Sequence, residues 1–300
     1  MTVRTCTKVN VGLNVLRKRA DGFHDLETLF VPYYGLGDDL TVEPADKLSI
    51  TIERDGGVDW DPMEDLTVKA WKLLKADFPS LSPVQIHLVK GAPVGAGLGG
   101  GSADAAFMLR ILNELGSLGL SDSELAAYAA RLGSDCAFFV YCHPMFATGR
   151  GEILEPFPID LSAYDLQVEI PLDATTGKPV AVSTKEAYGG IVPREVQQID
   201  NMFVTNNRLG HSAQTVSGKY RNNSDIHLTG DGILPLREAL RLSVDQWRGL
   251  VVNDFEGTVC ARHPEIKAKI EEFYSHGAAY AAMSGSGSAV FGLTLRPVGR

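Results

Sequence analysis

The chain has 300 residues, of which 44% are hydrophobic and 22% are charged. This balance is typical of a globular protein with a buried core. It excludes a collagen, a disordered chain and a small fold that depends on a disulfide framework. The formal net charge is −9, so we expect no broad surface for nucleic acid, and an anionic ligand must be held locally.

The sequence also predicts a cytoplasmic protein without a membrane partner. No apolar run approaches the roughly 20 residues that span a bilayer, and the first residues lack the apolar core of a signal peptide. The cysteines show no CxxC pair and no neighbouring His cluster. We therefore predict buried, reduced thiols, and neither a zinc site nor a redox pair, at Cys6, Cys136, Cys142 and Cys260.

The first predicted element is a strand at residues 8–15. Apolar and polar residues alternate there, and the polar positions carry one Lys, one Gly and two Asn. This polar face is either solvated or built to offer hydrogen-bond donors. A helix follows at 61–78, where Asp61 and Pro62 supply a cap and a first helical residue, and a strand is expected at 84–90.

A glycine-rich loop at residues 95–101 leads from that strand into a buried helix at 103–115, which Ser102 can cap. Five of the seven loop residues are glycine, so successive backbone N–H groups can converge on a phosphate at the helix N-terminus. The loop matches G-x-G-x-x-G, but a second capped helix at 121–133 stands where a dinucleotide fold needs its next strand. A Walker loop is excluded because no Lys precedes Ser102.

Asp135 is the candidate catalytic acid or base. It follows the second helix directly and enters the apolar run 136–140, which we expect to be a buried strand. Phosphoryl transfer needs a group that orients the attacking hydroxyl and a cation that offsets developing charge. Asp135 and Lys8, from the polar face of the first strand, are candidates for these two roles.

The second half of the chain carries fewer chemical signals. Strands are predicted at 164–170 and 289–295, and helices at 184–188, 235–247 and 264–274. The stretch 197–230 is polar and lacks periodicity, so we expect a long loop there. A Gly/Ser loop at 284–288 precedes the last strand.

Taken together, these segments resemble the GHMP kinase superfamily over nearly the whole chain apart from about 197–230. The matching segments are 8–13, 19–30, 93–106, 132–139, 183–188, 253–256 and 283–291. The segment Asp-Gly-Phe-His-Asp-Leu-Glu-Thr-Leu-Phe at 21–30 narrows the resemblance to the branch that acts on a cytidine diphosphate derivative of methylerythritol.

The resemblance implies an α+β fold of two domains, with the site between them. The N-terminal domain, expected at 1–152, is similar to the second domain of ribosomal protein S5, and the C-terminal domain, expected at 153–300, is ferredoxin-like. The implied reaction transfers the γ-phosphoryl group of ATP to the tertiary C2 hydroxyl of the small-molecule substrate. Mg²⁺ is expected as a cofactor with unassigned ligands, and the protein is expected to be a monomer or weak homodimer.

The resemblance also assigns roles to individual residues. Asp135 is the general base, Lys8 steadies the carboxylate and the phosphoryl group, and Asn10 contacts the substrate. His24 hydrogen-bonds the cytosine, which a ring with one donor and one acceptor can do selectively. Aromatic residues sandwich the base, and the residues expected to bind the nucleotide surround the glycine loop. These are Phe23 and Tyr188 for the base, and Lys90, Pro93, Gly95, Gly97, Leu98, Gly99, Gly100, Gly101, Ser102 and Ala103 for ATP.

Three positions depart from the family pattern. Phe23 replaces a usual Tyr, Asp65 replaces a customary Asn near the adenine, and Ala103 removes a frequent hydroxyl. Other readings stay open beside the main one. They are a GHMP kinase for homoserine or mevalonate, a NAD-dependent oxidoreductase that uses the glycine loop, and a non-catalytic nucleotide sensor.

Overall fold

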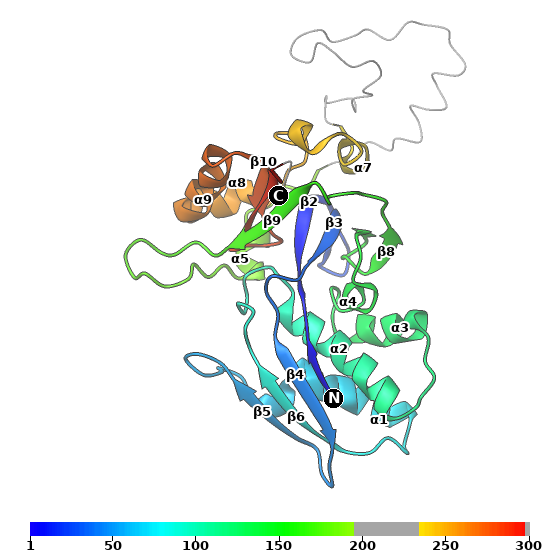
Figure 1. Ribbon diagram of the computed structural model, residues 1–300. Helices are drawn as coiled ribbons and strands as arrows, with labels where there is room; N and C mark the ends of the chain where they lie inside the picture. Colours follow the sequence, from blue (N-terminus) through cyan, green and yellow to red (C-terminus); the bar gives the residue numbers. More distant parts are fainter. Residues whose placement is uncertain (195–233, 298–300) are drawn as a thin grey trace, which may run out of the picture.

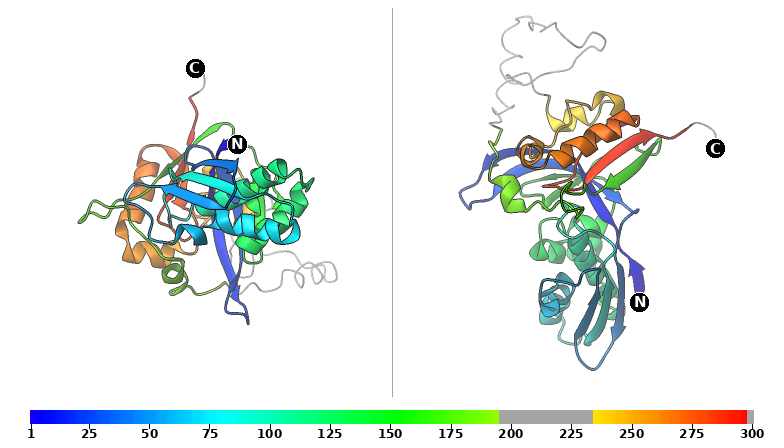
Figure 2. Two further views of the ribbon diagram at one scale, coloured as in Figure 1. Left: turned by 90° about the horizontal axis from the view of Figure 1, so that it is seen from below. Right: turned by 90° about the vertical axis from the view of Figure 1, so that its left-hand side faces the viewer.

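The computed structural model of the protein describes residues 1–194 and 234–297, so the loop predicted at 197–230 lies outside the described residues. Strands of the described residues form three separate sheets, with helices packed beside them (Figure 1). The α+β class expected from the sequence is confirmed. Figure 2 shows an elongated molecule in which the N-terminal strands run from one end of the molecule toward the other.

The first sheet lies at the lower end of Figure 1 and has the order β1–β4–β6–β5. Its strands are β1 (Thr2–Arg4), β4 (Asp39–Pro44), β5 (Ser49–Glu53) and β6 (Val84–Val89). β5 and β6 are parallel, whereas the other pairs are antiparallel. The helices α1 (Leu66–Asp77), α2 (Gly100–Leu115) and α3 (Asp122–Leu132) pack against one another and against this sheet around one apolar core.

The second sheet is antiparallel, with the order β2–β3–β7–β8. Its strands are β2 (Thr7–Lys18), β3 (His24–Tyr33), β7 (Met145–Thr148) and β8 (Ile153–Pro156). The first nine residues of β2 are buried on both faces. The polar face predicted for residues 8–15 is therefore not solvated, because Lys8, Asn10 and Asn14 are each 3% exposed.

The third sheet lies at the upper end of Figure 1 and has the order β10–β11–β9. Its strands are β9 (Tyr164–Glu169), β10 (Ala278–Met283) and β11 (Val290–Leu295), all paired antiparallel. α9 (Pro264–Ser275) packs across β10 and β11, and α8 (Glu256–Arg262) precedes it. Gly292 lets α9 approach closely, because a Cβ there would lie 2.3 Å from the ring of Phe273.

Several predicted elements differ from the observed ones. The run 136–140, predicted as a strand, forms the short helix α4 (Phe138–Tyr141), since five apolar residues cannot by themselves distinguish a buried strand from a buried helix. The predicted helix at 235–247 is broken into α7 (Leu236–Ala239) and a 3₁₀ turn (Val244–Gln246) by Ser243, which is extended. Asp61 caps a 3₁₀ turn, η1 (Pro62–Glu64), and Asp65 caps α1. The helix predicted at 184–188 is confirmed as α5 (Thr184–Tyr188).

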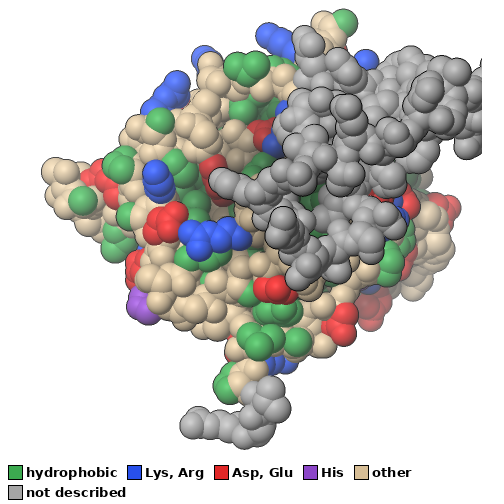
Figure 3. Space-filling model, turned by 90° about the horizontal axis from the view of Figure 1, so that it is seen from above, with side chains coloured by type: hydrophobic (Ala, Val, Ile, Leu, Met, Phe, Trp, Pro, Cys, Tyr) green, Lys and Arg blue, Asp and Glu red, His purple; other side chains and the backbone are tan. Residues whose placement is uncertain are grey.

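The surface carries charges of both signs. On the face shown in Figure 3, Lys and Arg side chains alternate with Asp and Glu. Among the helices of residues 1–194 and 234–297, none combines the length and the apolar character needed to cross a bilayer.

Candidate active site

The glycine loop turns sharply into the N-terminus of α2. Gly95, Gly97 and Gly99 have φ angles of +75°, +78° and +74°, a region that only glycine adopts without strain. Gly99, and not the predicted Ser102, is the N-cap, so the helix already begins at Gly100. Successive N–H groups therefore lie in a left-handed loop at a helix N-terminus, which is the arrangement that binds phosphate.

A second loop, residues 284–288, packs directly against the glycine loop. Ser284 Oγ donates to Gly97 O at 3.2 Å, and Ala289 N donates to Ala96 O at 3.1 Å. A Cβ on Gly97 would lie 2.3 Å from Ser284 O, so this position requires glycine for space as well as for its φ angle. The contact joins the third sheet to the start of α2.

Asn253 and Glu256 hydrogen-bond the backbone of the second loop and of Met283, the residue before it. Asn253 Nδ2 donates to Met283 O and to Gly285 O, both at 2.8 Å. Glu256 Oε1 accepts a hydrogen bond from Met283 N at 2.8 Å. Burial raises the pKa of Glu256 to about 7. Sequence reasoning gave no role to these two residues, although both lie in the segment 253–256 that carries part of the family resemblance.

Lys8 and Asp135 meet beside the glycine loop, although they are far apart in the chain. Lys8 Nζ lies 3.5 Å from Asp135 Oδ2 and donates to Gly97 O at 2.8 Å and to Asn10 Oδ1 at 2.5 Å. The Lys8 side chain is 3% exposed and the Asp135 side chain is 34% exposed. Burial lowers the pKa of Lys8, and the charge of Asp135 opposes that effect. The carboxylate is thus open to a ligand, with the ammonium group beneath it.

The Asn10 side chain hydrogen-bonds two neighbouring side chains of the protein. Its Oδ1 accepts from Lys8 Nζ, and its Nδ2 donates to Thr28 Oγ1 at 3.1 Å. The side chain is buried, so it fixes the position of the Lys8 ammonium group. The substrate contact of Asn10 stays a prediction.

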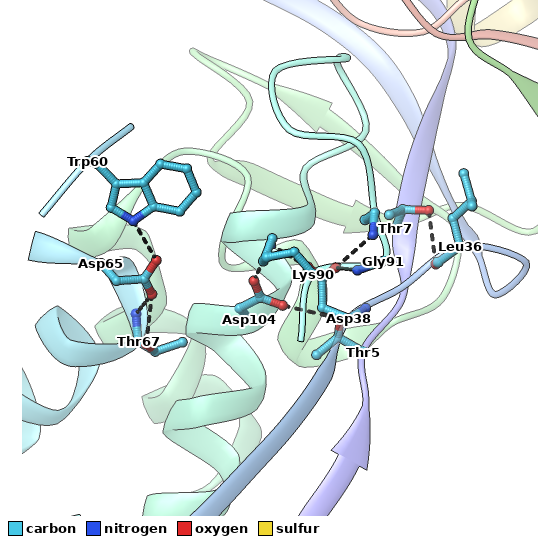
Figure 4. A network of polar contacts seen from close by, with 11 residues as sticks. Thr5, Thr7, Leu36, Asp38, Trp60, Asp65, Thr67, Lys90, Gly91 and Asp104 are labelled. Carbon is cyan, nitrogen blue, oxygen red and sulfur yellow. Dashed lines mark hydrogen bonds and ion pairs between the residues drawn. The ribbon is translucent and has the colours of Figure 1, made fainter. Parts of the chain in front are cut away.

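Lys90 lies in a buried polar network beneath the glycine loop, shown in Figure 4. Its ammonium group donates to Asp104 Oδ2 at 2.7 Å and also to Asp38 Oδ2. Asp38 Oδ1 in turn accepts from the N–H groups of Gly91 and Ala92, each at 2.7 Å. Although burial favours the neutral amine, the two carboxylates hold the pKa of Lys90 above its usual value.

This network ties the entrance of the glycine loop to the first turn of α2. Burial raises the pKa of Asp104 to about 8, an effect that Lys90 opposes. The Lys90 side chain is 4% exposed, and its ammonium group pairs with the buried carboxylates of Asp38 and Asp104. Its predicted contact with the nucleotide stays a prediction. Sequence reasoning missed Asp38 and Asp104, because nothing in their local sequence indicates that they share a cation.

Asp65, the residue that departs from the family pattern near the adenine, has several partners. It accepts from Thr67 N at 2.9 Å, from Thr67 Oγ1 at 2.7 Å and from Trp60 Nε1 at 3.2 Å (Figure 4). The carboxylate thus caps α1 and fixes the indole ring. An Asn has only one side-chain oxygen, so it could accept from Thr67 but could not also accept from Trp60 Nε1 at the position of Oδ2.

His24, at the start of β3, and Tyr188, at the end of α5, come together. Their rings stack with centroids 4.8 Å apart and planes 24° apart. The pKa of Tyr188 is raised by burial and, to a smaller extent, by the charge of Asp135. The pKa of His24 is lowered by burial and by Lys18, so the neutral ring with one donor and one acceptor is favoured.

Phe23 lies at the protein surface beside Arg150, and its predicted stacking on the base stays a prediction. Its side chain is 56% exposed, and the Arg150 guanidinium lies 5.0 Å from its ring centroid. Arg150 belongs to the turn between β7 and β8, where a Cβ on the next residue, Gly151, would lie 3.8 Å from Asp135 Oδ1. Sequence reasoning missed Arg150. The Gly-Arg-Gly triplet at 149–151, with both glycines at positive φ, is the signal that could have indicated it.

The remaining predicted nucleotide residues line the same loop and helix start. Leu98 O accepts from Lys8 N at 2.9 Å, which attaches the loop backbone to β2. Cys136, which follows Asp135, is buried, and burial raises the pKa of its thiol to about 12. Leu98 and Ala103 are buried, whereas Pro93 and Ser102 are half-buried and Gly101 is exposed. Among the described residues, no three His, Cys, Asp or Glu side chains gather as they would around a metal ion.

Two family models match this chain. The GHMP kinases N terminal domain matches residues 65–143, which include the glycine loop and Asp135, and the GHMP kinases C terminal domain matches 236–298. A crystal structure of homoserine kinase from Cytophaga hutchinsonii is 16% identical, covers 98% of this chain and 85% of its own, and superposes with a TM-score of 0.60. That likeness shows a shared fold. The fold and the glycine-loop site define a GHMP kinase.

Closer relatives narrow the family. The 4-diphosphocytidyl-2-C-methyl-D-erythritol kinase of Bacteroides thetaiotaomicron is 39% identical over 289 residues, which are 95% of this chain and 89% of that protein. The kinase of the same name from Nitratidesulfovibrio vulgaris is 33% identical over 297 residues, 99% of this chain and 91% of that protein. A crystal structure of 4-(cytidine 5'-diphospho)-2C-methyl-D-erythritol kinase is 30% identical, covers 98% of this chain and 90% of its own, and has a TM-score of 0.67. The chain belongs to the 4-diphosphocytidyl-2-C-methyl-D-erythritol kinase family.

Proposed function

We propose that Asp135 and Lys8 form the catalytic pair of an ATP-dependent kinase that phosphorylates the C2 hydroxyl of 4-diphosphocytidyl-2-C-methyl-D-erythritol. The chain's family acts on this alcohol in the synthesis of isoprenoid precursors. The observation that carries the residue assignment is the contact of Lys8 Nζ with both Asp135 and the glycine-loop carbonyl of Gly97.

In this proposal Asp135 accepts the proton of the C2 hydroxyl as that oxygen attacks the γ-phosphorus atom. The bond from the γ-phosphorus to the bridging oxygen breaks, and ADP leaves. The Lys8 ammonium group pairs with the carboxylate before the reaction and offsets the negative charge that develops on the transferred phosphoryl group. Its depth beneath Asp135 keeps it near both groups without blocking access to the carboxylate.

The glycine loop and the start of α2 hold the ATP phosphates through backbone N–H groups and the helix dipole. Mg²⁺ usually binds through one or two protein oxygen atoms together with phosphates and water. The half-buried Ser102 hydroxyl at the start of α2 fits such a sparse protein contribution. When bound, the ion would neutralise part of the charge on the phosphates.

The cytidine end of the substrate is assigned to His24, Tyr188 and Phe23. Stacking of a base on an aromatic ring is worth about 1–3 kcal/mol, and a neutral imidazole can pair with cytosine. Because His24 and Tyr188 already stack on each other, the base enters by stacking on an exposed face or by separating the two rings. Arg150 contacts the ring of Phe23, and the residue that follows it, Gly151, lies close to Asp135. We therefore assign Arg150 to the diphosphate that joins the two ends of the substrate.

The deciding experiment measures ADP release from ATP with the cytidine diphosphate alcohol, with homoserine and with mevalonate. We expect turnover with the first alcohol only. Turnover with homoserine or mevalonate would favour another GHMP kinase, and ATP binding without ADP release from any alcohol would favour a nucleotide sensor. Binding of NADH instead of ATP would favour an oxidoreductase and would overturn the proposal.

A further inference from the structure

Cys6 and Cys142 form a thiol pair that the sequence spacing does not indicate. They are 136 positions apart, yet their Sγ atoms lie 3.7 Å apart. Cys6 precedes β2 and is 1% exposed, whereas Cys142 ends α4 and is half-buried. The prediction that the chain contains no redox pair rested on the absence of a CxxC motif. It took no account of cysteines that the fold brings together.

The two thiols differ in the way that thiol–disulfide exchange requires. A hydrogen bond from Cys6 lowers the pKa of Cys142, and the charge of Arg110 adds to that effect, whereas the pKa of Cys6 is raised by its hydrogen bond with Cys142 and by burial. The more accessible sulfur is therefore the better nucleophile, and the buried sulfur lies beside it as the resolving thiol. Both are free in the structure.

The pair also lies next to the catalytic residues. Cys6 is two residues before Lys8 on the same extended segment, and Cys142 ends the helix that follows Asp135. α4 supports the glycine loop as well, since a Cβ on Gly99 would lie 2.9 Å from Phe139 Cζ. A disulfide is about 2.05 Å long, so its formation draws the two sulfurs together by about 1.6 Å. This movement takes place directly beside the start of β2 and the end of α4, the two elements that flank Lys8 and Asp135.

We propose that Cys6 and Cys142 are a modification site for low-molecular-weight disulfides, and that the resulting disulfide lowers the kinase activity. The Cys142 thiolate attacks one sulfur of glutathione disulfide, that S–S bond breaks, and one glutathione thiolate leaves. Cys6 loses its proton to solvent and attacks the Cys142 sulfur of the mixed disulfide, which releases the second glutathione. Two protein thiols are oxidised and one glutathione disulfide is reduced to two thiols.

The test begins with the linkage, which is independent of any activity. The full chain is incubated with glutathione disulfide, free thiols are blocked with iodoacetamide, and an unreduced digest is examined by mass spectrometry. We expect a peptide pair linked through Cys6 and Cys142, and the pair should disappear after treatment with dithiothreitol. If Cys142 carries only glutathione and no linked pair forms, the proposal is overturned.

The second readout is ADP release with the cytidine diphosphate alcohol, and this part rests on the proposed function. Oxidation should lower turnover at least about tenfold, because misplacement of catalytic groups by about 1 Å is costly, and dithiothreitol should restore it. After incubation with glutathione disulfide, the C142S variant should keep its activity. The control variant C260S should lose activity under the same treatment, as the parent protein does. C6A serves as a second variant if C142S folds poorly. Unchanged turnover of the linked protein would overturn the effect on activity, whereas an inactive reduced protein would instead count against the proposed function.

Discussion

Asp135 and Lys8 show how burial divides the roles of two charged residues in contact. Lys8 is enclosed and has three polar neighbours, so its position is fixed before any ligand arrives. Asp135 has a third of its side chain exposed, which allows an alcohol to approach the carboxylate. A fixed cation beneath an accessible base is the preorganised arrangement that phosphoryl transfer favours.

The Asp135→Asn variant tests this division at the residue scale. An amide cannot accept the hydroxyl proton, so turnover should fall by about 10² to 10⁴, the usual cost of losing a general base. The affinity for ATP, measured by calorimetry in the absence of the alcohol, should change little. Turnover close to that of the parent would contradict the role assigned to Asp135.

Glu256 provides a prediction about pH. Burial raises its pKa from 4.5 to about 7, so the folded protein binds this proton more tightly than the unfolded chain does. The stability that Glu256 contributes is therefore fully present below pH 4.5 and is lost as the pH rises through about 7. The Glu256→Gln variant keeps an acceptor for Met283 N and has no such proton.

The free energy of unfolding in urea should be measured for both proteins between pH 5 and pH 8. We expect the stability of the parent relative to Glu256→Gln to decrease across this range. A difference that is constant with pH, or that increases, would show that Glu256 is ionised throughout.

At the scale of elements, the glycine loop at 95–101 and the loop at 284–288 form one unit because they pack directly against each other. The glycine loop leaves no room for a side chain at Gly97, and the loop at 284–288 places Ser284 O there. Asn253 and Glu256 fix the second loop from α8 and the segment before it. The phosphate cradle predicted from one sequence motif is therefore a structure made from both halves of the chain.

Gly97→Ala and Gly95→Ala form a matched pair that separates conformation from space. Both residues have a positive φ, but a Cβ on Gly95 would meet nothing within 4 Å, whereas one on Gly97 would meet Ser284 O. Gly95→Ala should lower the free energy of unfolding by about 1–2 kcal/mol, the usual cost of the left-handed region. Gly97→Ala should cost more than that and should weaken ATP binding, because the two loops must separate. Equal losses in the two variants would show that the close packing contributes nothing.

At the scale of the whole molecule, the segment formed by Cys6 and β2 contributes side chains to each of the three apolar cores of the described residues. Cys6, just before the strand, lies in the core of the first sheet and its helices, Val11 lies in the core beneath the third sheet, and Val15 lies in the core beside α8 and α9. One segment therefore joins regions that would otherwise be separate folding units.

This connection predicts a single cooperative unfolding transition, although the family models divide the chain into two parts. Val11→Ala removes two buried methyl groups and should lower the stability by about 2 kcal/mol. Calorimetry should show the whole transition moving to lower temperature. Two resolved transitions, of which only one moves in the variant, would contradict the prediction.

The sequence predicted the α+β class, the glycine loop and the two catalytic candidates, because periodicity and glycine clusters are local signals. It could not show that the polar side of residues 8–15 is buried, since that depends on what packs over Lys8 and Asn10. The ion pairs of Lys90 and the Cys6–Cys142 contact were missed for the same reason. The domain boundary at 152/153 stays a prediction, and the hairpin of β7 and β8 spans it.

The attachment of β2 to the end of the chain has a consequence for biosynthesis. Leu13 N donates to Val252 O at 2.9 Å, and Asn10 N donates to Ser284 Oγ at 3.2 Å across 274 positions of sequence. On a ribosome that adds about 5–20 residues per second, the first long strand waits tens of seconds for these partners. Its edge stays open to other nascent chains throughout that interval, so holding by a chaperone should raise the yield of folded enzyme.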